Sequence, residues 1–351
     1  MKMEDRRKSM RIGTRSIGPE FPPLVIAEIG INHEGSYQKA VRMVDDACAA
    51  GCECVKFQSH IVEDEMIPND VVPGHVKETI WAIMKRCALS EQEEIRLKDY
   101  VESKGMIYLC TPFSRAAAVR LESMGVSAYK IGSGECNNYP LVRHIAHYGK
   151  PVVLSTGMND IESIAPAVAI LREAGVPFAL LHCTSMYPTP YGKVRLGAIS
   201  QLAGRFSDAV VGLSDHSLGN YACYAAVALG ASILEKHFTS DKRWPGPDVA
   251  LSMDPPELRD LVVGARAVFE ALGGEKNILP EERPTIDFAY ACVVSIRDIA
   301  AGERLDGANI WVKRPGTGEI KARHFESLLG KTALRSIPLN TQLNWADVDL
   351  S

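Results

Sequence analysis

Short apolar runs recur along the first 250 or so residues of the chain, and each run ends in polar residues. There are about eight of them, and most are separated by a segment whose apolar residues have helical spacing. This alternation is typical of a parallel sheet with crossover helices, and near-continuous Val, Ile, Leu and Ala runs indicate strands buried on both faces. About eight such units predict a closed (β/α)8 TIM barrel. From N to C the runs are LVIAEIG, CECVKFQ, MIYLCTPF, SAYKIGSGE, PVVLSTG, FALLHCTS, AVVGLSDH and SILEKHFT.

Helix signals between the runs support this fold. Ser36 is placed to cap a helix that ends at Gly51, and a second apolar stripe begins at Ile161 and ends at Gly175. Asp254 followed by Pro255 predicts the start of a helix after the last strand.

One connection is unusually long. About fifty residues separate VKFQ from the third strand, and they include IVEDEMIPNDVVPGH. Long loops after barrel strands usually shape the substrate mouth, although a simple surface excursion is the alternative.

The barrel pattern stops near GGEKNILPEERP, where Gly, Pro and charged residues are concentrated. Such a composition is typical of an interdomain linker. We therefore predict a barrel over residues 1–274, a linker over 275–287 and a small domain of short strands and turns over 288–351. A domain of this size has a thin core, so we expect it to lean on another surface.

Composition excludes several classes of function. The net charge is −4 and no basic block is present, which argues against nucleic acid or an anionic membrane as a partner. No apolar run approaches the ~20 residues of a membrane span, and the N-terminus MKMEDRRKSM lacks the apolar core of a signal peptide. The nine cysteines are scattered, so we predict reduced thiols in a cytoplasmic protein.

Two histidines end successive predicted strands, His216 in LSDHS and His237 in EKHF. Adjacent barrel strands would bring their rings together, with Glu235 beside them. Neutral imidazoles among oxygen ligands favour Mn²⁺, Co²⁺ or Fe²⁺ over a tetrahedral zinc site. The alternative is a pair of strand-end histidines that only form hydrogen bonds.

Two lysines, Lys56 and Lys130, lie inside apolar strand ends, where a cation needs an anionic partner. Nearby hydroxyls and the Gly-flanked amides of IGSGE and LSTGM would complete a site for a phosphate and a carboxylate. A salt bridge to Glu28 is the structural alternative, and a Schiff-base role for Lys130 is the chemical one. The hydroxyls belong to Ser133, Ser155 and Ser214.

Carboxylates at the strand ends are candidates for proton transfer, because a crowded and partly dry site tunes their pKa values. They are Glu28, Glu135 and Glu235. Tyr187 in MYPTP and Asp248 in PGPD follow later strands and are placed to contact a polyol.

The motifs just described resemble those of the sialic acid synthase family across essentially the whole chain. They are AEIGINHEGS, VKFQ, TPFS, YKIGSGECNNYPL, LSTGM, HCT followed by YPTP, GLSDHS and EKHFT, and the C-terminal part with WVKRPGTG is similar to that family's antifreeze-like (SAF) domain. The resemblance implies a barrel enzyme that condenses phosphoenolpyruvate with an open-chain N-acetylhexosamine, releasing phosphate and forming a nonulosonic acid.

The resemblance also implies roles for single residues. His216 and His237 would hold a divalent metal, most often Mn²⁺ with Co²⁺ or Mg²⁺ as alternatives, and Glu235 would serve a metal-bound water. The phosphoenolpyruvate region would comprise Lys56, Thr111, Lys130, Ser133, Ser155, Ser185, Tyr187 and Ser214. Contacts to the sugar would come from Glu28, Gln58, Tyr187, Asp248 and His75. In a domain-swapped homodimer, Arg314 would reach the partner's sugar, and Thr285 and Phe288 would help to line that side of the site.

Two positions depart from family members that otherwise match well. Ser185 stands where they have Asn in HCTN, near the phosphate, and His75 stands where they have Asn after Pro-Gly in the long loop. The first changes one phosphate contact, and the second bears on which sugar fits.

The resemblance therefore implies, as the main expectation, a synthase of N-acetylneuraminate that acts on N-acetylmannosamine. One alternative keeps the chemistry but uses a dideoxy-diacetamido hexose, giving a legionaminate or pseudaminate. Two others change the class, to a Schiff-base aldolase or to a non-catalytic binding or ice-binding protein.

Overall fold

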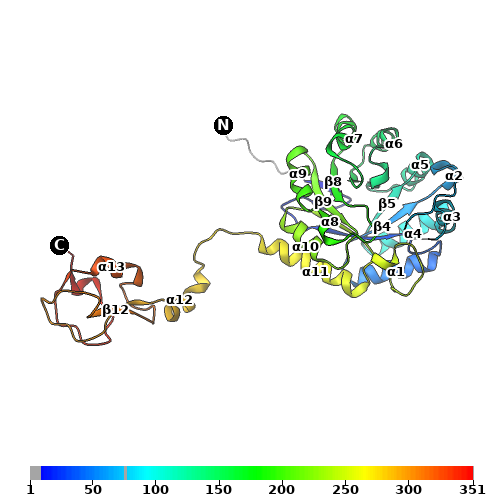
Figure 1. Ribbon diagram of the computed structural model, residues 1–351. Helices are drawn as coiled ribbons and strands as arrows, with labels where there is room; N and C mark the ends of the chain where they lie inside the picture. Colours follow the sequence, from blue (N-terminus) through cyan, green and yellow to red (C-terminus); the bar gives the residue numbers. More distant parts are fainter. Residues whose placement is uncertain (1–8, 75–76, 351) are drawn as a thin grey trace. The chain divides into compact units, whose positions relative to one another are not determined.

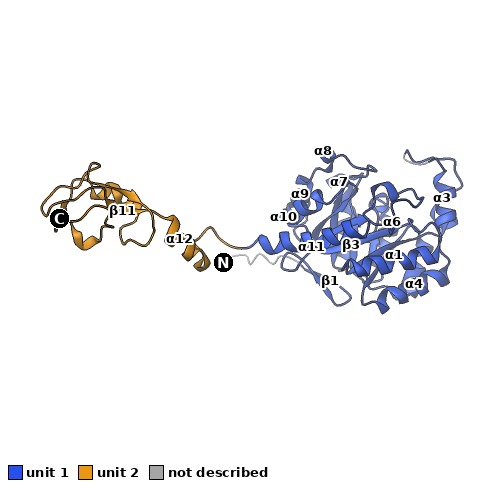
Figure 2. Cartoon of the chain, turned by 90° about the horizontal axis from the view of Figure 1, so that it is seen from below, with its two compact units in different colours: residues 1–273 blue, residues 274–351 orange. Residues whose placement is uncertain are grey.

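The computed structural model describes residues 9–74 and 77–350. The chain divides into two compact units, Met1–Gly273 and Gly274–Ser351, which are coloured separately in Figure 2. Each unit has a hydrophobic core of its own.

Eight parallel strands of the first unit form a nearly closed barrel, which confirms the predicted fold (Figure 1). The hydrogen-bonded order is β5-β4-β3-β10-β9-β8-β7-β6, and the end strands β5 and β6 lie next to each other. Almost every strand residue is buried, which explains the continuous apolar runs in the sequence. The strands are β3 (Leu24–Gly30), β4 (Cys54–Ser59), β5 (Ile107–Pro112), β6 (Tyr129–Ile131), β7 (Val152–Ser155), β8 (Phe178–Cys183), β9 (Val210–Asp215) and β10 (Ile233–His237).

Helices surround the barrel and pack their buried faces against the strands (Figure 1). The predicted starts are confirmed: Ser36 accepts a hydrogen bond from Lys39 N at 3.3 Å, and Asp254 and Glu257 form a capping box. In the described part of the chain, every helix is too short or too polar to cross a lipid bilayer. The helices are α1 (Tyr37–Ala49), α2 (Val62–Glu65), α3 (Ile80–Cys87), α4 (Glu91–Ser103), α5 (Arg115–Ser123), α6 (Tyr139–Ala146), α7 (Ile161–Glu173), α8 (Tyr191–Val194), α9 (Gly197–Arg205), α10 (Tyr221–Ala228) and α11 (Pro255–Ala271).

A short antiparallel hairpin precedes the barrel, and the sequence pattern did not predict it. It consists of β1 (Met10–Ile12) and β2 (Arg15–Ile17). Its apolar side chains pack on barrel-interior residues near the strand starts, such as Leu24 and Ile233. The hairpin therefore covers the amino-terminal end of the barrel, and the polar strand ends lie at the opposite one.

The second unit is small and rich in short strands, as predicted. The segment predicted as a linker contains the 3-10 turn η3 (Pro280–Glu282) and most of α12 (Arg283–Ala289), so part of it is helical. Two antiparallel pairs follow, β11 (Cys292–Ser295) with β12 (Ile310–Lys313) and β13 (Thr332–Ala333) with β14 (Val348–Asp349). With α13 (Phe325–Leu328), these elements enclose a core that includes Val293, Ile310 and Leu343.

Candidate active site

The carboxyl ends of the barrel strands surround a cavity of about 300 Å³. Strand register explains why distant motifs meet there: Glu28 lies opposite both Lys56 and His237, and Glu235 lies opposite Ser214. The predicted residues that line the cavity are Glu28, Lys56, Gln58, Thr111, Lys130, Ser133, Ser155, Ser185, Tyr187, Ser214, His216, Glu235, His237 and Asp248.

The floor of the cavity carries two lysines and two carboxylates, all of them buried. Lys56 Nζ lies 2.8 Å from Glu28 Oε2 and 3.7 Å from Glu235 Oε1. Lys130 Nζ lies 3.6 Å from the same Glu235 oxygen, so Glu235 stands between the two cations. Gln58 Nε2 donates to Glu28 Oε1 at 2.9 Å. The predicted salt bridge between Lys56 and Glu28 is therefore present within the cavity.

Burial and neighbouring charges shift the pKa values of these four groups in different directions. Burial raises the pKa of Glu28, and the nearby Lys56 offsets this only in part. Burial also acts to raise the pKa of Glu235, but Lys130 and Lys56 outweigh it and hold that pKa below its usual value. Burial lowers the pKa of Lys130. For Lys56 the two carboxylates outweigh burial, so its pKa is raised. Glu235 is thus held ionised, and Glu28 accepts a proton more readily.

Hydroxyl groups extend from the lysines along one wall. Lys56 Nζ donates to Thr111 Oγ1 at 3.0 Å, and Lys130 Nζ donates to Ser155 Oγ at 2.8 Å. The next segment along this wall is held by Gly157 N, which donates to Ser133 Oγ at 2.9 Å. A Cβ at Gly157 would come within 2.8 Å of that hydroxyl oxygen, so only glycine fits there without a shift. This arrangement of cations and hydroxyls suits an oxyanion such as a phosphate.

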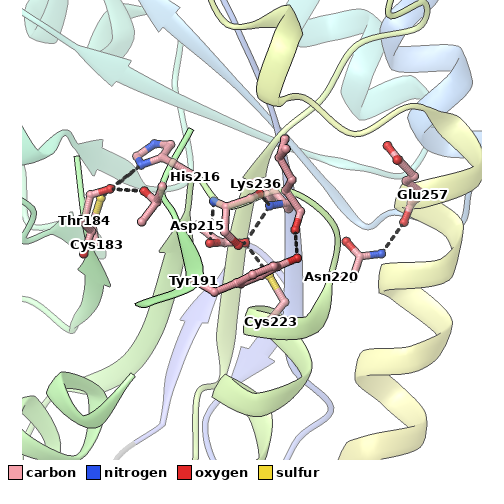
Figure 3. A network of polar contacts seen from close by, with 12 residues as sticks. Cys183, Thr184, Tyr191, Asp215, His216, Asn220, Cys223, Lys236 and Glu257 are labelled. Carbon is pink, nitrogen blue, oxygen red and sulfur yellow. Dashed lines mark hydrogen bonds and ion pairs between the residues drawn. The ribbon is translucent and has the colours of Figure 1, made fainter. Parts of the chain in front are cut away.

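The two histidines face each other on the opposite wall, with ring centroids 5.4 Å apart. The ring of Tyr187 lies over that of His216, with centroids 4.2 Å apart. His216 Nδ1 lies 3.1 Å from the carbonyl oxygen of Thr184 (Figure 3), a contact in which Nδ1 donates, so that Nε2 carries the lone pair when the ring is neutral. Burial acts to lower the pKa of His216, but its contacts with Cys183 and the Thr184 carbonyl outweigh burial and raise that pKa. Burial lowers the pKa of His237 to about 4, so its imidazole is neutral at pH 7.

These groups fit a divalent cation. His237 Nδ1 and Glu235 Oε2 are buried and lack a hydrogen-bond partner among the described residues, and both are metal-ligating atoms. Asp248 Oδ2 lies 3.8 Å from His237 Nδ1. No group of three or more His, Cys, Asp or Glu side chains in residues 9–74 and 77–350 forms a complete metal site. Two histidines would therefore bind a metal whose other ligands come from water or substrate.

An apolar wall completes the cavity, and the sequence argument did not identify its residues. We use the name "apolar wall" for Ile31, Pro73, Ile80, Ile83 and Met84, all of which line the cavity. Most of them come from the long connection after β4, whose helix α3 presents Ile80, Ile83 and Met84. The length of that connection was the available signal, because it indicated a loop at the substrate mouth.

The remaining predicted residues lie elsewhere. Thr285, Phe288 and Arg314 belong to the second unit, so their role toward a sugar stays a prediction. His75 lies outside the described residues. Glu135, considered for proton transfer, is not among the residues that line the cavity and accepts a hydrogen bond from Asn138 Nδ2 at 2.6 Å.

The chain matches known proteins of one family both in sequence and in structure. The NeuB family model matches residues 43–277, more than half of the chain, and the SAF domain model matches residues 290–349. An uncharacterized protein of Methanocaldococcus jannaschii is 40% identical and covers 97% of this chain and 99% of its own length. N,N'-diacetyllegionaminic acid synthase of Legionella pneumophila is 33% identical, covering 96% of this chain and 98% of its own.

A solved structure gives the same result. The crystal structure of N-acetylneuraminic acid synthetase from Leptospira borgpetersenii superposes with a TM-score of 0.73 at 32% identity, covering 80% of this chain and 95% of that one. Family models and relatives agree over both units. The chain is therefore an enzyme of the NeuB family, the sialic acid synthase family, in which a TIM barrel is followed by an SAF domain.

Proposed function

We propose that this enzyme condenses phosphoenolpyruvate with open-chain N-acetylmannosamine and water to give N-acetylneuraminate and phosphate. The observation that carries the proposal is the division of one cavity into two walls. Lys56, Lys130 and their hydroxyl partners line one wall, and His216 and His237 face them from the other. Such a cavity holds an anionic donor next to a polar acceptor.

Phosphoenolpyruvate would be held by the lysines and hydroxyls. Both ammonium groups are buried, so their charge-assisted hydrogen bonds to a phosphate and a carboxylate are stronger than they would be in water. When Lys56 exchanges its ion pair with Glu28 for one with the substrate, the Glu28 carboxyl group becomes free for proton transfer. Ser185, Ser133 and the Gly157 amide lie at the end of the same wall.

The carboxylates would move the protons of the reaction. The methylene carbon of phosphoenolpyruvate attacks the aldehyde carbon, and Glu28 donates a proton to the aldehyde oxygen as it becomes a hydroxyl. Positive charge develops at the central carbon of the former phosphoenolpyruvate. Glu235, held ionised by the two lysines, takes a proton from the water that adds there. Collapse of the tetrahedral intermediate to the ketone breaks the C–O bond to phosphate, which leaves with the bridging oxygen.

His216 and His237 would hold the divalent cation, with Mn²⁺ expected and Co²⁺ or Mg²⁺ as alternatives. When bound, such a cation polarises the aldehyde carbonyl as a Lewis acid. Tyr187, whose ring is tilted against that of His216 and edge-on to that of His237, would orient the acceptor beside them. Gln58 and Asp248 lie where they would bind sugar hydroxyls.

A diacetamido sugar is the second candidate acceptor, and the apolar wall favours it. A 6-deoxy sugar carries a methyl group where N-acetylmannosamine carries a hydroxymethyl group, and its second acetamido group adds another methyl. Burying a methyl group against Ile80, Ile83 or Met84 contributes about 0.8 kcal/mol. The similarity to a legionaminic acid synthase supports this alternative.

We also infer a cytoplasmic, domain-swapped homodimer. Both substrates are intracellular metabolites in type, and the second unit carries the exposed Arg314 that would complete the partner's site. The dimer is tested by subunit mixing, as argued below.

The test of the proposed function is phosphate release with a panel of acceptor sugars in ¹⁸O-labelled water. We expect unlabelled phosphate and a nonulosonic acid labelled at the oxygen of C2, its ketone carbon, with the highest kcat/KM marking the native sugar. Label in the phosphate would contradict C–O cleavage. A reaction that uses pyruvate and releases no phosphate would establish an aldolase instead.

A further inference from the structure

A buried ion pair lies directly behind the two histidines of the site. Asp215 precedes His216 and Lys236 precedes His237, and the register of β9 with β10 places Asp215 opposite Lys236. Successive strand residues point to opposite faces, so this pair points away from the cavity that Glu235 lines. It reaches the side of α10, where Cys223 Sγ lies 3.7 Å from Asp215 Oδ2 (Figure 3).

The pair ties together the chain on both sides of His216. Asp215 Oδ1 accepts from Ser217 N at 2.9 Å, and Asp215 Oδ2 accepts from Ser217 Oγ at 2.9 Å. Lys236 Nζ lies 2.7 Å from Asp215 Oδ2 and also donates to the carbonyl oxygen of Ser217. One carboxylate thus closes a three-residue turn with His216 in the middle, and the residue before His237 holds that turn from the next strand.

Further contacts fix the loop that follows. Tyr191 Oη donates to the carbonyl oxygen of Leu218, and Asn220 Nδ2 donates to the carbonyl oxygen of Glu257 at 2.9 Å (Figure 3). The loop after His216 is therefore attached to α8 on one side and to α11 on the other. These attachments restrict the backbone that carries the imidazole of His216.

Stability alone gives a weak reason for such a pair. The Asp215 and Lys236 side chains are each 1% exposed, and neither contacts the cavity. Burying two charges costs desolvation free energy, and apolar residues of similar volume in place of such pairs are often neutral or stabilising. What this pair provides is a fixed distance between the two strand ends that carry the histidines. Outer-shell groups that hold a metal's ligands in place commonly tune metal affinity tenfold to a hundredfold, and this pair holds the two histidines through the backbone and not through their rings.

We propose that Asp215 and Lys236 are positioning residues that hold His216 and His237 at the separation needed for a shared divalent cation. This inference rests on the metal site of the proposed function. It assigns the buried pair to metal affinity and not to binding of phosphoenolpyruvate, whose lysines and hydroxyls lie on the other wall.

The test measures Mn²⁺ binding to the metal-free, full-length protein by electron paramagnetic resonance. The variant Asp215→Asn/Lys236→Met removes the ion pair and the tie to the Ser217 carbonyl, and it keeps the volume of both side chains. We expect Mn²⁺ affinity to fall at least about tenfold. The affinity for phosphoenolpyruvate without metal, followed by calorimetry, should change less than about twofold, since no lysine or hydroxyl of its wall is altered.

A matched control alters an ion pair elsewhere in the barrel unit. Arg120 Nη1 on α5 lies 3.0 Å from Glu94 Oε1 on α4, and Glu94 is buried while Arg120 is partly buried. The variant Glu94→Gln/Arg120→Met should leave Mn²⁺ affinity unchanged. If the Asp215/Lys236 variant does not fold, the variant Ser217→Ala tests the positioning role instead, because it removes only one hydroxyl contact to Asp215. We expect that variant to bind Mn²⁺ about threefold more weakly.

The outcomes separate the inference from the function on which it rests. Unchanged Mn²⁺ affinity in the folded double variant, or in Ser217→Ala where only that folds, would overturn the positioning role. Equal losses of Mn²⁺ and phosphoenolpyruvate binding would overturn it as well, since they indicate a general structural role. If the unaltered protein does not bind Mn²⁺, the proposed metal site itself fails and the inference fails with it.

Discussion

Lys130 Nζ and Glu235 Oε1 lie 3.6 Å apart although their strands, β6 and β10, are not neighbours in the barrel. The contact therefore crosses the barrel interior. It places a buried cation next to a buried carboxylate at the base of the cavity. A polyanionic substrate arriving there meets a site whose positive charge is already oriented, so little reorganisation accompanies binding.

Removing the Lys130 cation should abolish most of the activity. For Lys130→Met we expect a loss on the order of 2–4 kcal/mol in transition-state stabilisation, that is roughly 30- to 1,000-fold in kcat/KM. The variant Lys130→Arg keeps the positive charge but not the shape of the side chain, so it should retain only part of the kcat/KM that Lys130→Met loses. Steady-state kinetics with varied phosphoenolpyruvate measure both effects.

Borohydride trapping checks the chemistry of Lys130. An electrostatic lysine forms no adduct when the enzyme is reduced in the presence of pyruvate or phosphoenolpyruvate. A covalent adduct at Lys130, located by peptide mass, would make it a Schiff-base residue and contradict the proposed mechanism.

Adding one methyl group at Gly157 should disturb the phosphate wall. The new Cβ in Gly157→Ala would collide with Ser185 Oγ, its nearest neighbour, and would approach Ser133 Oγ to 2.8 Å and Cys183 Sγ to 3.0 Å, so the two hydroxyl groups must move. We expect the KM for phosphoenolpyruvate to rise by about tenfold or more, with Mn²⁺ affinity nearly unchanged. Gly204→Ala is the control, because Gly204 lies on α9 outside the cavity lining and a Cβ there meets nothing within 4 Å.

Much of the barrel was predictable because its strands are buried on both faces. The run LVIAEIG coincides with β3, Leu24–Gly30, since apolar residues begin and end with the strand. The run SAYKIGSGE did not stay extended, because Ser133–Glu135 turns into the short helix η1. The hairpin β1–β2 was missed, since two three-residue strands give too little periodicity, although Gly13 at φ +57° marks the turn between them.

Most of the predicted residues of the cavity end a strand or follow a strand end within a few residues, although Asp248 lies further along the loop after β10. Their common edge follows from topology, so residues as distant as Glu28 and Glu235 met as expected. The apolar wall and the Asp215–Lys236 pair depend on contacts between segments whose packing has no short-range signature. Ile83 looks like any core residue of α3 in sequence, and only the fold shows that it faces the cavity.

Metal removal should abolish turnover. After exhaustive chelation we expect no phosphate release, with activity restored best by Mn²⁺ or Co²⁺ because two imidazoles among oxygen ligands suit those ions. His237→Ala should lose both metal binding and activity. Full turnover by metal-free enzyme, with residual metal measured by mass spectrometry, would exclude a catalytic role for the ion.

Acid should destabilise the metal-free protein through His33, which lies outside the cavity lining. Burial lowers the pKa of His33 to about 4, and its Nδ1 accepts a hydrogen bond from Gly35 N at 3.1 Å. Between pH 6.5 and 4 the unfolded state binds a proton that the folded state does not. The free energy of unfolding should therefore fall as pH drops through that range, by a total on the order of 3 kcal/mol from this group.

His33→Asn tests this assignment, because its Oδ1 can accept the hydrogen bond from Gly35 without titrating. Urea unfolding at pH 7 and at pH 4.5 should show a smaller loss of stability for this variant than for the unaltered protein. His147→Asn, at an exposed position, should retain the full loss. An equal acid loss in the His33 variant would assign the effect to other groups.

The second unit should complete a site in trans. Arg314 lies in a Pro-Gly turn of that unit and is exposed, with fixed charge and planar donors suited to a sugar's amide carbonyl or hydroxyls. In a domain-swapped dimer, a mixture of Arg314→Ala and His237→Ala chains gives heterodimers with one fully intact site. When equal amounts of the two chains exchange at random, half of the dimers are heterodimers, so about a quarter of all sites and of the unaltered activity should be restored.

The control mixes His237→Ala with Lys130→Met, which both alter the barrel. This mixture should restore no activity, because each site of the heterodimer then carries a defect. Heterodimers that form, as mass measurement would confirm, but that stay inactive in the first mixture would mean that Arg314 serves the barrel of its own chain or none.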